Sequence, residues 1–167
     1  MSDQLDLLIV AIPPVGLDGP PLGSSLVAAA AKRAGFSVQS KDFNLKFYLR
    51  NREHSVVREF ISQDTFSAEG IAKAKFDEIL NNEINHWLEE VLAAKPRWLG
   101  ISIFSLRAKK PLIRFLRRLK KVAPDQKIVI GGSGLTNDDF PEKYLAEGVI
   151  DAFIKGEGEE AIIELLN

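Results

Sequence analysis

Short apolar runs alternate with longer segments of helical periodicity along the whole chain. The first run, Leu5 to Ile12, is apolar at every position except Asp6 and stops at a pair of prolines, which is typical of a strand buried on both faces of a parallel sheet. Leu22 to Ala34 follows with an alanine-rich apolar stripe, and Gly35 stands where such a helix would end. Phe36 to Phe43 is a second strand-like run. These segments predict a strand–helix–strand unit with a right-handed crossover.

The same alternation continues to the last residue. Residues 45–94 are too long for a loop, and the apolar spacing over Ile71 to Leu92 predicts one long helix after two short ones, as a helical insertion between the second and third strands. The later strands are predicted at Trp98–Phe104, Lys127–Ile130 and Asp151–Ile154, and the later helices at Pro111–Val122, Asp139–Glu147 and Glu157–Leu166.

This order of elements predicts one α/β domain over residues 1–167, with a doubly wound sheet of five parallel strands in the flavodoxin-like or Rossmann-like order 2-1-3-4-5. Such sheets bind ligands beyond the carboxyl ends of their strands. Functional residues are therefore expected directly after each strand. Those segments are Pro13–Ser25, Asp42–Leu45, Ser102–Arg107, Gly131–Asn137 and Lys155–Glu160.

Composition narrows the possible chemistry. The 167 residues include no cysteine, which excludes disulfides, thiolate zinc sites, a cysteine nucleophile and a cysteine-ligated iron–sulfur cluster within this chain. The 22 Lys and Arg nearly balance the 23 Asp and Glu, so no overall field attracts nucleic acid or a membrane surface. The polar start and the short apolar run after it fit neither a signal peptide nor a spanning helix. We therefore expect a cytoplasmic protein with neither a nucleic-acid partner nor a membrane partner.

A run of eight basic residues lies between Arg107 and Lys121. Leu112, Phe115, Leu116 and Leu119 mark the buried face of the helix there, so most of these charges are expected to face water. The alternatives are a surface that docks another domain, an acidic carrier or nucleic acid.

The segment after the first strand is rich in glycine and proline. It reads IPPVGLDGPPLGSS, in which the prolines restrict the backbone and Gly23 and Ser24 would open a helix N-terminus that can receive an anion or an amide-rich ligand. A stiff turn that only starts the helix explains the same residues. The segment lacks the spacing of a dinucleotide fingerprint and of a P-loop.

Two further glycine-rich segments follow the fourth and fifth strands. Gly131, Gly132, Ser133 and Gly134 let a ligand approach the backbone, or permit a turn with positive φ. Ser133 is not at a nucleophile elbow, because Leu135 stands where a glycine would be required. The run Gly156-Glu157-Gly158 precedes the last helix, where acidic residues also complement the helix dipole.

The first loop disfavours two other classes of protein that have such folds, the receivers and the flavodoxins. A phosphoacceptor receiver requires clustered acids after the first strand, and a flavodoxin requires a loop rich in serine and threonine, whereas this chain has Pro13 and Pro14 there. Lys155 alone stands where a receiver has its lysine.

Taken together, PPLGSSLVAAAAKRAGFSV, DFNL, GISIFS, IVIGGSG and GVIDAFIKGEGEEAIIELL follow one another in a specific order and spacing. In that order they resemble the N-terminal cobalamin-binding domain of B12-dependent radical SAM enzymes of the methyltransferase type, over nearly the whole chain. The cofactor-binding positions that the resemblance implies are Pro13, Pro14, Asp18, Pro20, Gly23, Ser24, Asn44, Ser102, Phe104, Ser105, Leu106, Gly131, Gly132, Ser133, Gly134, Gly156, Glu157 and Gly158, with no catalytic residue and no metal ligand.

The chain departs from related cobalamin domains at one position. Those domains carry D-x-H-x-x-G in the first loop, followed by S-x-L and a Gly-Gly pair. Here Asp18, Pro20 and Gly23 stand at the Asp, His and Gly positions, Ser102-Ile103-Phe104 resembles S-x-L, and Gly131-Gly132 resembles the glycine pair. The resemblance therefore implies base-off cobalamin without a histidine ligand, since proline has no nitrogen to offer. Neither His54 nor His86 stands in a motif that would replace it.

The resemblance also implies a role for the glycines and a partner. The dimethylbenzimidazole tail would lie near Ser102 and Gly131–Gly134, so a bulky residue at Gly132 is expected to abolish binding and leave the fold intact. We expect a cobalamin carrier for methyl transfer or related radical chemistry, with no autonomous activity. The iron–sulfur cluster and S-adenosylmethionine would belong to a radical SAM catalytic domain outside these residues, in the same polypeptide or a separate chain. The alternatives are a cofactor-free docking or substrate-binding domain of the same fold, and a flavodoxin-like nucleotide-binding or signalling domain.

Overall fold

A single parallel sheet organises the molecule. The computed structural model describes residues 4–63, 66–135 and 139–167. Its strands are β1 (Leu7–Ala11), β2 (Val38–Asp42), β3 (Trp98–Ser102), β4 (Lys127–Gly131) and β5 (Ala152–Ile154), and all of them pair in parallel in the order β2-β1-β3-β4-β5. The predicted fold class and strand order are confirmed. Thr136 and Asn137, at the end of one predicted functional segment, lie outside the described residues.

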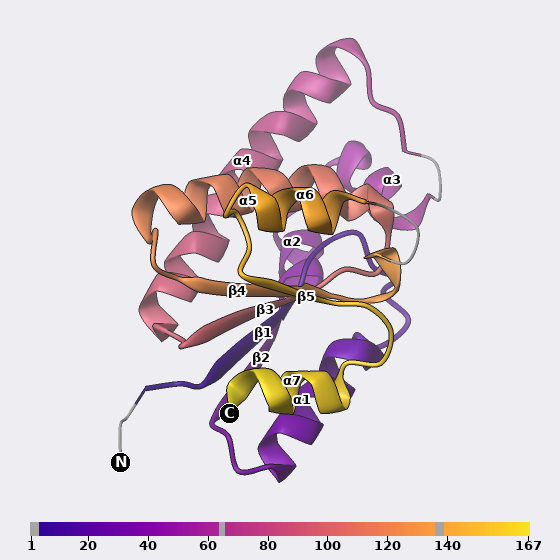
Figure 1. Cartoon of the computed structure of the whole chain (residues 1–167). Coiled ribbons are helices and arrows are strands. Elements are labelled where there is room, and N and C mark those ends of the chain that lie inside the picture. The colour runs from indigo at the N-terminus through magenta and orange to yellow at the C-terminus, as the bar shows by residue number, and fades with distance from the viewer. Residues whose placement is uncertain (1–3, 64–65, 136–138) are drawn as a thin grey trace.

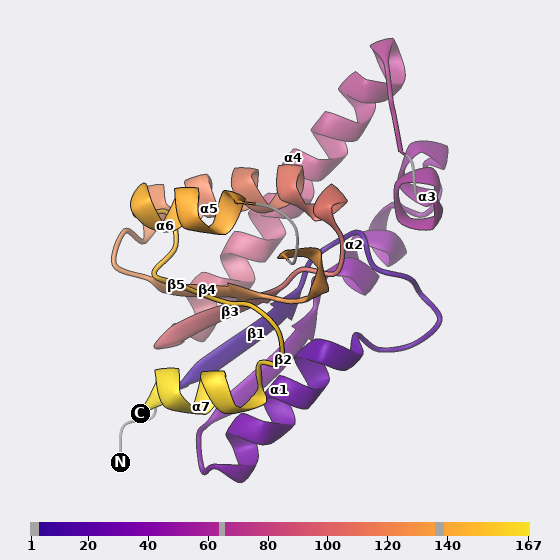
Figure 2. The same cartoon turned by 45° about the vertical axis from the view of Figure 1, so that its right-hand side comes forward.

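Helices cover both faces of this sheet (Figure 1). On one face lie α1 (Leu22–Arg33) and α7 (Glu159–Leu166), which pack against each other. The second layer contains α2 (Phe43–Asn51), α3 (Ser55–Ser62), α4 (Gly70–Ala94), α5 (Lys109–Val122) and α6 (Phe140–Ala146). Two short 3-10 turns, η1 (Leu106–Ala108) and η2 (Ser133–Leu135), follow β3 and β4. Figure 2 shows α4 extending well beyond the sheet, with α3 beside its far half.

The helical insertion starts earlier than the pattern predicts. The second strand was expected to run to Phe43, but β2 ends at Asp42 and α2 begins at Phe43. The Asp42 carboxylate accepts a hydrogen bond from the Leu45 N–H at 2.8 Å, which is a side-chain cap of the first turn. Phe43 is fully buried and stacks on Trp87 of α4, with ring centroids 5.6 Å apart. The start of α2 is thus fixed by a cap and by packing against α4, neither of which is visible as periodicity.

The two faces of the sheet bury separate cores. The larger core lies between the sheet and the five-helix layer, and includes Leu8, Val10, Ile101 and Ile130. The smaller core lies under α1 and α7 and is formed by Leu7, Ile9, Ala28, Ala31, Val38, Val129, Ile162 and Leu166. Alternate residues of one strand enter different cores, as the two-residue period of a strand requires. None of the helices in the described residues is both long and apolar enough to cross a lipid bilayer.

Several basic side chains of α5 (Lys109–Val122) make contacts with α4 that the charge pattern of α5 does not predict. Lys110 and Arg114 of α5 pair with Asp77 of α4 at 3.2 and 2.9 Å, and Arg118 donates to the Asn81 carbonyl and side chain. Burial raises the pKa of Asp77, but these two cations outweigh it and hold that pKa below its ordinary value. Three of the eight basic residues, Lys110, Arg114 and Arg118, thus join α5 to α4.

Candidate functional site

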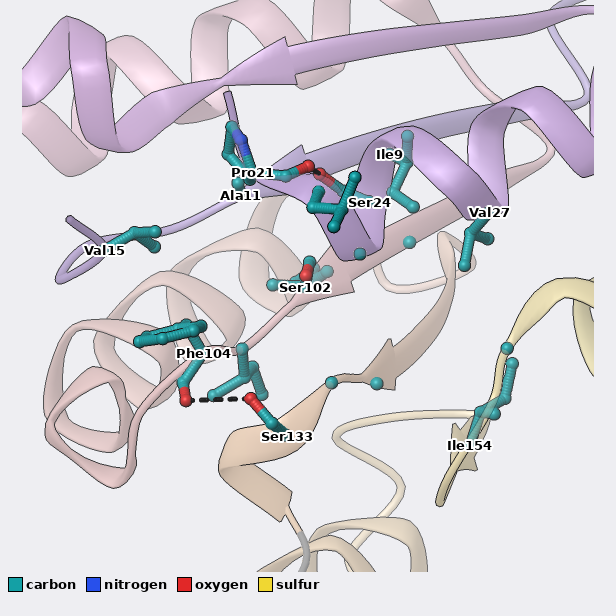
Figure 3. A pocket seen from close by; sticks show the side chains of 18 of the residues that line it. Ile9, Ala11, Val15, Pro21, Ser24, Val27, Ser102, Phe104, Ser133 and Ile154 are labelled. Atoms are coloured by element: carbon teal, nitrogen blue, oxygen red, sulfur yellow. Dashed lines mark hydrogen bonds between the residues drawn. The ribbon is translucent and has the colours of Figure 1, made fainter. Parts of the chain in front are cut away.

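A cavity of about 540 Å³ opens at the carboxyl ends of the strands, on the side covered by α1 and α7. Figure 3 looks into it, with Ser24 and Val27 on α1, Ser102 at the end of β3 and Ile154 at the end of β5. The loop after β1 and the glycine-rich segments after β4 and β5 complete its wall. The cavity lies where a doubly wound sheet of this order is expected to bind its ligand.

The strand register explains why space is left here. Ala11 pairs with Ser102, Ser102 with Gly131, and Gly131 with Ile154, so three small residues lie side by side on neighbouring strands. Their side chains face α1 and α7, because the residues before them, such as Ile130, enter the other core. The carboxyl edge of the sheet thus offers a floor with almost no side chains on it.

The two covering helices approach each other closely at the same level. A Cβ atom on Gly158, at the start of α7, would lie 3.0 Å from a methyl group of Val27 on α1. Glycine at position 158 therefore allows this contact, which sets the width of the cavity roof. One turn further along α7, Ile162 lines the inner end.

The first turn of α1 opens toward the mouth of the cavity. Pro21 is the N-cap residue and provides no side-chain cap. The hydroxyls of Ser24 and Ser25 donate back to the Pro21 carbonyl at 3.0 and 2.9 Å, so they do not cap the first-turn amides either. Amides of this kind are satisfied by water or by a ligand's acceptor groups.

In the part of the chain that the structure describes, the charged residues that line the cavity are all acidic. They are Asp18 in the first loop, Glu157 before α7 and Glu159 in the first turn of α7. Three carboxylates around one opening accept hydrogen bonds from the N–H groups of amides, and they disfavour a ligand that carries several negative phosphate charges. The rim therefore favours an amide-rich ligand over a polyanionic one.

Most of the residues predicted to bind a cofactor meet in this cavity. Those that line it are Asp18, Pro20, Gly23, Ser24, Ser102, Phe104, Gly131, Gly132, Ser133, Gly156, Glu157 and Gly158. They come from four separate segments of the chain, which the fold brings to one edge of the sheet. Whether they contact a cofactor remains a prediction.

The other six predicted residues do not line it. Pro13 and Pro14 are buried at the start of the first loop, and Leu106 lies in η1. The Ser105 hydroxyl accepts a hydrogen bond from the Arg107 N–H, which caps η1. Asn44 is buried, and its side chain exchanges two hydrogen bonds of 3.0 Å with the backbone of Val15. Asn44 therefore fixes the first loop from behind, and Gly134 packs on the segment after β3.

The glycines after β4 have different reasons to be glycine. A Cβ atom on Gly132, which has φ of +115°, would lie 2.4 Å from the Ile103 carbonyl oxygen. A Cβ atom on Gly134 would lie 2.9 Å from the Ser105 nitrogen. The expectation that a bulky residue at Gly132 would leave the fold intact is therefore wrong, since it would displace the segment after β3. Gly131 differs, because its Cβ would meet only ordinary contacts of 3.6 and 3.7 Å with Ile154.

Sequence reasoning did not identify the apolar half of the lining. Ile9, Gly100 and Val129 on the strands, Val27 on α1 and Ile162 on α7 all line the cavity. Two signals could have found them: Gly100 stands two residues before Ser102 on the same strand, and Val27 stands one helical turn after Gly23. Both signals require the helix and strand faces to be assigned first.

Neither histidine approaches the cavity. His54 precedes α3 and lies 3.3 Å from a carboxylate oxygen of Glu53, and His86 lies on α4 at 3.6 Å from Glu89. Both belong to the layer on the opposite face of the sheet. Among the described residues, no group of three or more His, Asp or Glu side chains is arranged to hold a metal ion.

Two of three comparisons with known proteins find a match to this domain. A search of curated protein sequences gives no match. Two solved structures of the radical S-adenosylmethionine methyltransferase TsrM from Kitasatospora setae share the fold. One, with tryptophan substrate and a SAM analogue bound, has a TM-score of 0.61 and 15% identity over 96% of this chain. The other, with cobalamin and a [4Fe-4S] cluster bound, has a TM-score of 0.59 and 15% identity over 98% of this chain. The chain spans only 24% of the length of each.

A family model covers almost the whole molecule. The B12 binding domain model matches residues 9–166, from the middle of β1 to the last residue of α7. That span contains every residue that lines the cavity. The chain belongs to the B12-binding domain family.

Proposed function

We propose that this chain is the cobalamin-binding module of a B12-dependent radical SAM enzyme, and that the cavity under α1 and α7 holds the nucleotide tail of base-off cobalamin. The observation that carries the proposal is the floor formed by Ala11, Ser102 and Gly131, which leaves open a slot between the sheet and two helices. A flat heteroaromatic base requires such a slot, because side chains that project into the slot from the sheet or from the helices would take the space of the ring.

The chemistry of the lining fits this cofactor. The corrin carries amide side chains, whose N–H groups suit the carboxylates of Asp18, Glu157 and Glu159 at the mouth. Phe104 is 62% exposed and Leu22 is 70% exposed, and both border the opening. They offer apolar surface that a large macrocycle would cover. When bound, cobalamin supplies a cobalt centre that carries a methyl group or takes part in radical chemistry.

We place no histidine of this chain on cobalt. Pro20 stands at the histidine position of the related motif and lines the mouth of the cavity, and its ring nitrogen is part of the peptide bond. The two histidines lie on the other side of the sheet. The protein's task at the lower face is then to position the cofactor and to exclude other ligands.

We assign the radical SAM catalysis to a separate domain, in the same polypeptide or in another chain. A radical SAM cluster is held by cysteine thiolates, and this chain has no cysteine. The iron–sulfur cluster and S-adenosylmethionine would therefore be contributed by that partner. The 24% share of the TsrM structures that this fold matches supports the same division.

Mixing the purified protein with hydroxocobalamin, desalting it and recording the visible spectrum tests this proposal. We expect retained corrin with a base-off spectrum, and weaker retention of cobinamide, which lacks the nucleotide tail. A protein that stays colourless with every corrin would refute the proposal and favour a cofactor-free docking domain.

The absence of a histidine ligand has its own test. The variant Pro20→His should change the visible spectrum of bound cobalamin toward that of a nitrogen-ligated corrin, whereas Pro20→Ala should leave spectrum and affinity nearly unchanged. A large change in the spectrum with Pro20→Ala would contradict the assignment of Pro20.

A further inference from the structure

The cavity consists of two layers with different chemistry. The outer layer contains Ala11, Ser102 and Gly131 with the first turns of α1 and α7. The inner layer lies two strand residues and one helical turn deeper, about 5 to 7 Å further from the mouth. Ile9, Gly100, Val129, Val27 and Ile162 form it.

Among the described residues, those that form the inner layer have no polar side chain. Ile9, Val129 and Ile162 are at most 5% exposed and Val27 is half-buried, so most of the layer is also shielded from bulk water. Its backbone groups are engaged as well, because β1, β3 and β4 each lie between two neighbouring strands and pair with both. A polar atom placed there would have no partner in the protein.

The outer layer offers one suitable hydroxyl on the sheet. The Ser24 hydroxyl donates to the Pro21 carbonyl, and the Ser133 hydroxyl donates to the Phe104 carbonyl, as the dashed lines of Figure 3 mark. Ser102 makes no side-chain hydrogen bond within the described ranges 4–63, 66–135 and 139–167, and it lies at the centre of the floor. The floor thus provides for one polar atom of a ligand.

From this arrangement we infer that the cavity selects cobamides by their lower base and takes a benzimidazole in preference to a purine. The inference rests on the proposed function. A base-off benzimidazole has one free ring nitrogen, which the Ser102 hydroxyl satisfies, and its remaining edge is apolar like Val27, Val129 and Ile162. Adenine in the same place adds further ring nitrogens and an amino group, and the inner layer leaves these without partners. The three aliphatic side chains are the specificity-determining residues.

The expected discrimination follows from the cost of a buried unsatisfied polar group. One such group lowers affinity by about tenfold to a hundredfold. We therefore expect the wild-type chain to bind the adenine-containing cobamide at least about tenfold more weakly than cobalamin. Equilibrium dialysis of the full chain, with corrin absorbance as the readout, measures both dissociation constants directly.

Two variants test which residues carry the preference. Val129→Thr puts a hydroxyl into the inner layer at nearly unchanged volume, and Val27→Thr does the same from α1, should the first variant fold poorly. Either is expected to reduce the ratio of the two affinities by about threefold or more. Val38→Thr is the matched control, because Val38 belongs to the same small core but does not line the cavity.

The outcomes separate this inference from the function on which it rests. Tight cobalamin binding, weak binding of the adenine cobamide and a reduced ratio in the inner-layer variants support it. Equal affinity for the two cobamides overturns the selection and leaves the proposed function standing. A ratio that changes equally in Val38→Thr overturns the role of the inner layer. Failure to bind either cobamide refutes the proposed function itself.

Discussion

Gly131→Val is the substitution that most directly tests the floor of the cavity. Gly131 ends β4 between Ser102 and Ile154, and its missing side chain would project toward α1 and α7. A Cβ atom there would make only ordinary contacts, 3.6 Å from the Ile154 carbonyl oxygen and 3.7 Å from its Cβ. The backbone therefore accepts a side chain, and the added methyl groups enter the cavity.

The expected effects on stability and on binding have opposite signs. Glycine inside a strand costs about 0.5 to 1 kcal/mol relative to alanine, so the free energy of unfolding of the ligand-free variant should be unchanged or higher. Filling space that a ligand occupies costs about 1 to 3 kcal/mol when the surroundings are well packed. That cost corresponds to a weakening of cobalamin binding by about 5-fold to 150-fold.

Two measurements on the same samples decide the result. Urea unfolding gives the stability, and equilibrium dialysis against cobalamin gives the affinity. Ala152→Val is the matched control, because Ala152 lies on the same face of the neighbouring strand β5 but outside the cavity lining. The reasoning is refuted if Gly131→Val binds cobalamin as tightly as the wild type. It also fails if the variant loses several kcal/mol of stability, since Gly131 would then be required by the fold.

Two further predictions concern the fold itself. Gly132→Ala should destabilise the chain by about 1 to 3 kcal/mol in urea unfolding, because φ of +115° disfavours a side chain and Ile103 leaves no room for a Cβ atom. An unchanged free energy of unfolding would contradict the geometry after β4. Asp151→Asn should cost about 1 to 2 kcal/mol at pH 7. Burial raises the pKa of Asp151, but hydrogen bonds from Lys127, Ile128 and Lys120 outweigh it and lower that pKa overall. The stabilisation by the Asp151 carboxylate is thus complete above the unfolded-state pKa of about 3.9 and is lost as the pH falls through the folded-state pKa. The free energies of unfolding of variant and wild type should therefore approach each other below about pH 4. A difference that stays constant with pH would contradict this prediction.

The order of elements could be predicted because each strand is short and apolar and each helix has a regular stripe. Continuous apolar runs such as Leu7–Ala11 are buried on both faces, as the parallel sheet requires. The boundary at Phe43 could not be predicted in this way, since a carboxylate cap at Asp42 decides it. The pairing of Lys110 and Arg114 with Asp77 could not be predicted for a similar reason, because Asp77 lies on a helix that the charge pattern of α5 does not reveal.

The residues of the candidate site were likewise predicted only in part. Residues at the carboxyl ends of strands, such as Ser102 and Gly131, were found because the fold class directs attention to them. Val27 and Ile162 were missed, because a residue inside a helix becomes a lining residue only through the packing of two helices that are far apart in the sequence. Asn44 was predicted as a cofactor-binding residue, yet the structure gives it a positioning contact with Val15 rather than a place in the lining.

The glycines finally distinguish what the fold needs from what a ligand would need. Gly132 and Gly134 are required by the close approach of the segment after β3, so this chain would need them to fold with or without a cofactor. Gly131 has room for a side chain, and Gly23 has no atom within 4 Å of a Cβ position although glycine weakens the helix in which it lies. The fold alone gives no reason for glycine at positions 23 and 131, and both face the cavity. A domain that had lost its ligand would be free to replace them, and these two positions are therefore the strongest sequence argument that the cavity is used.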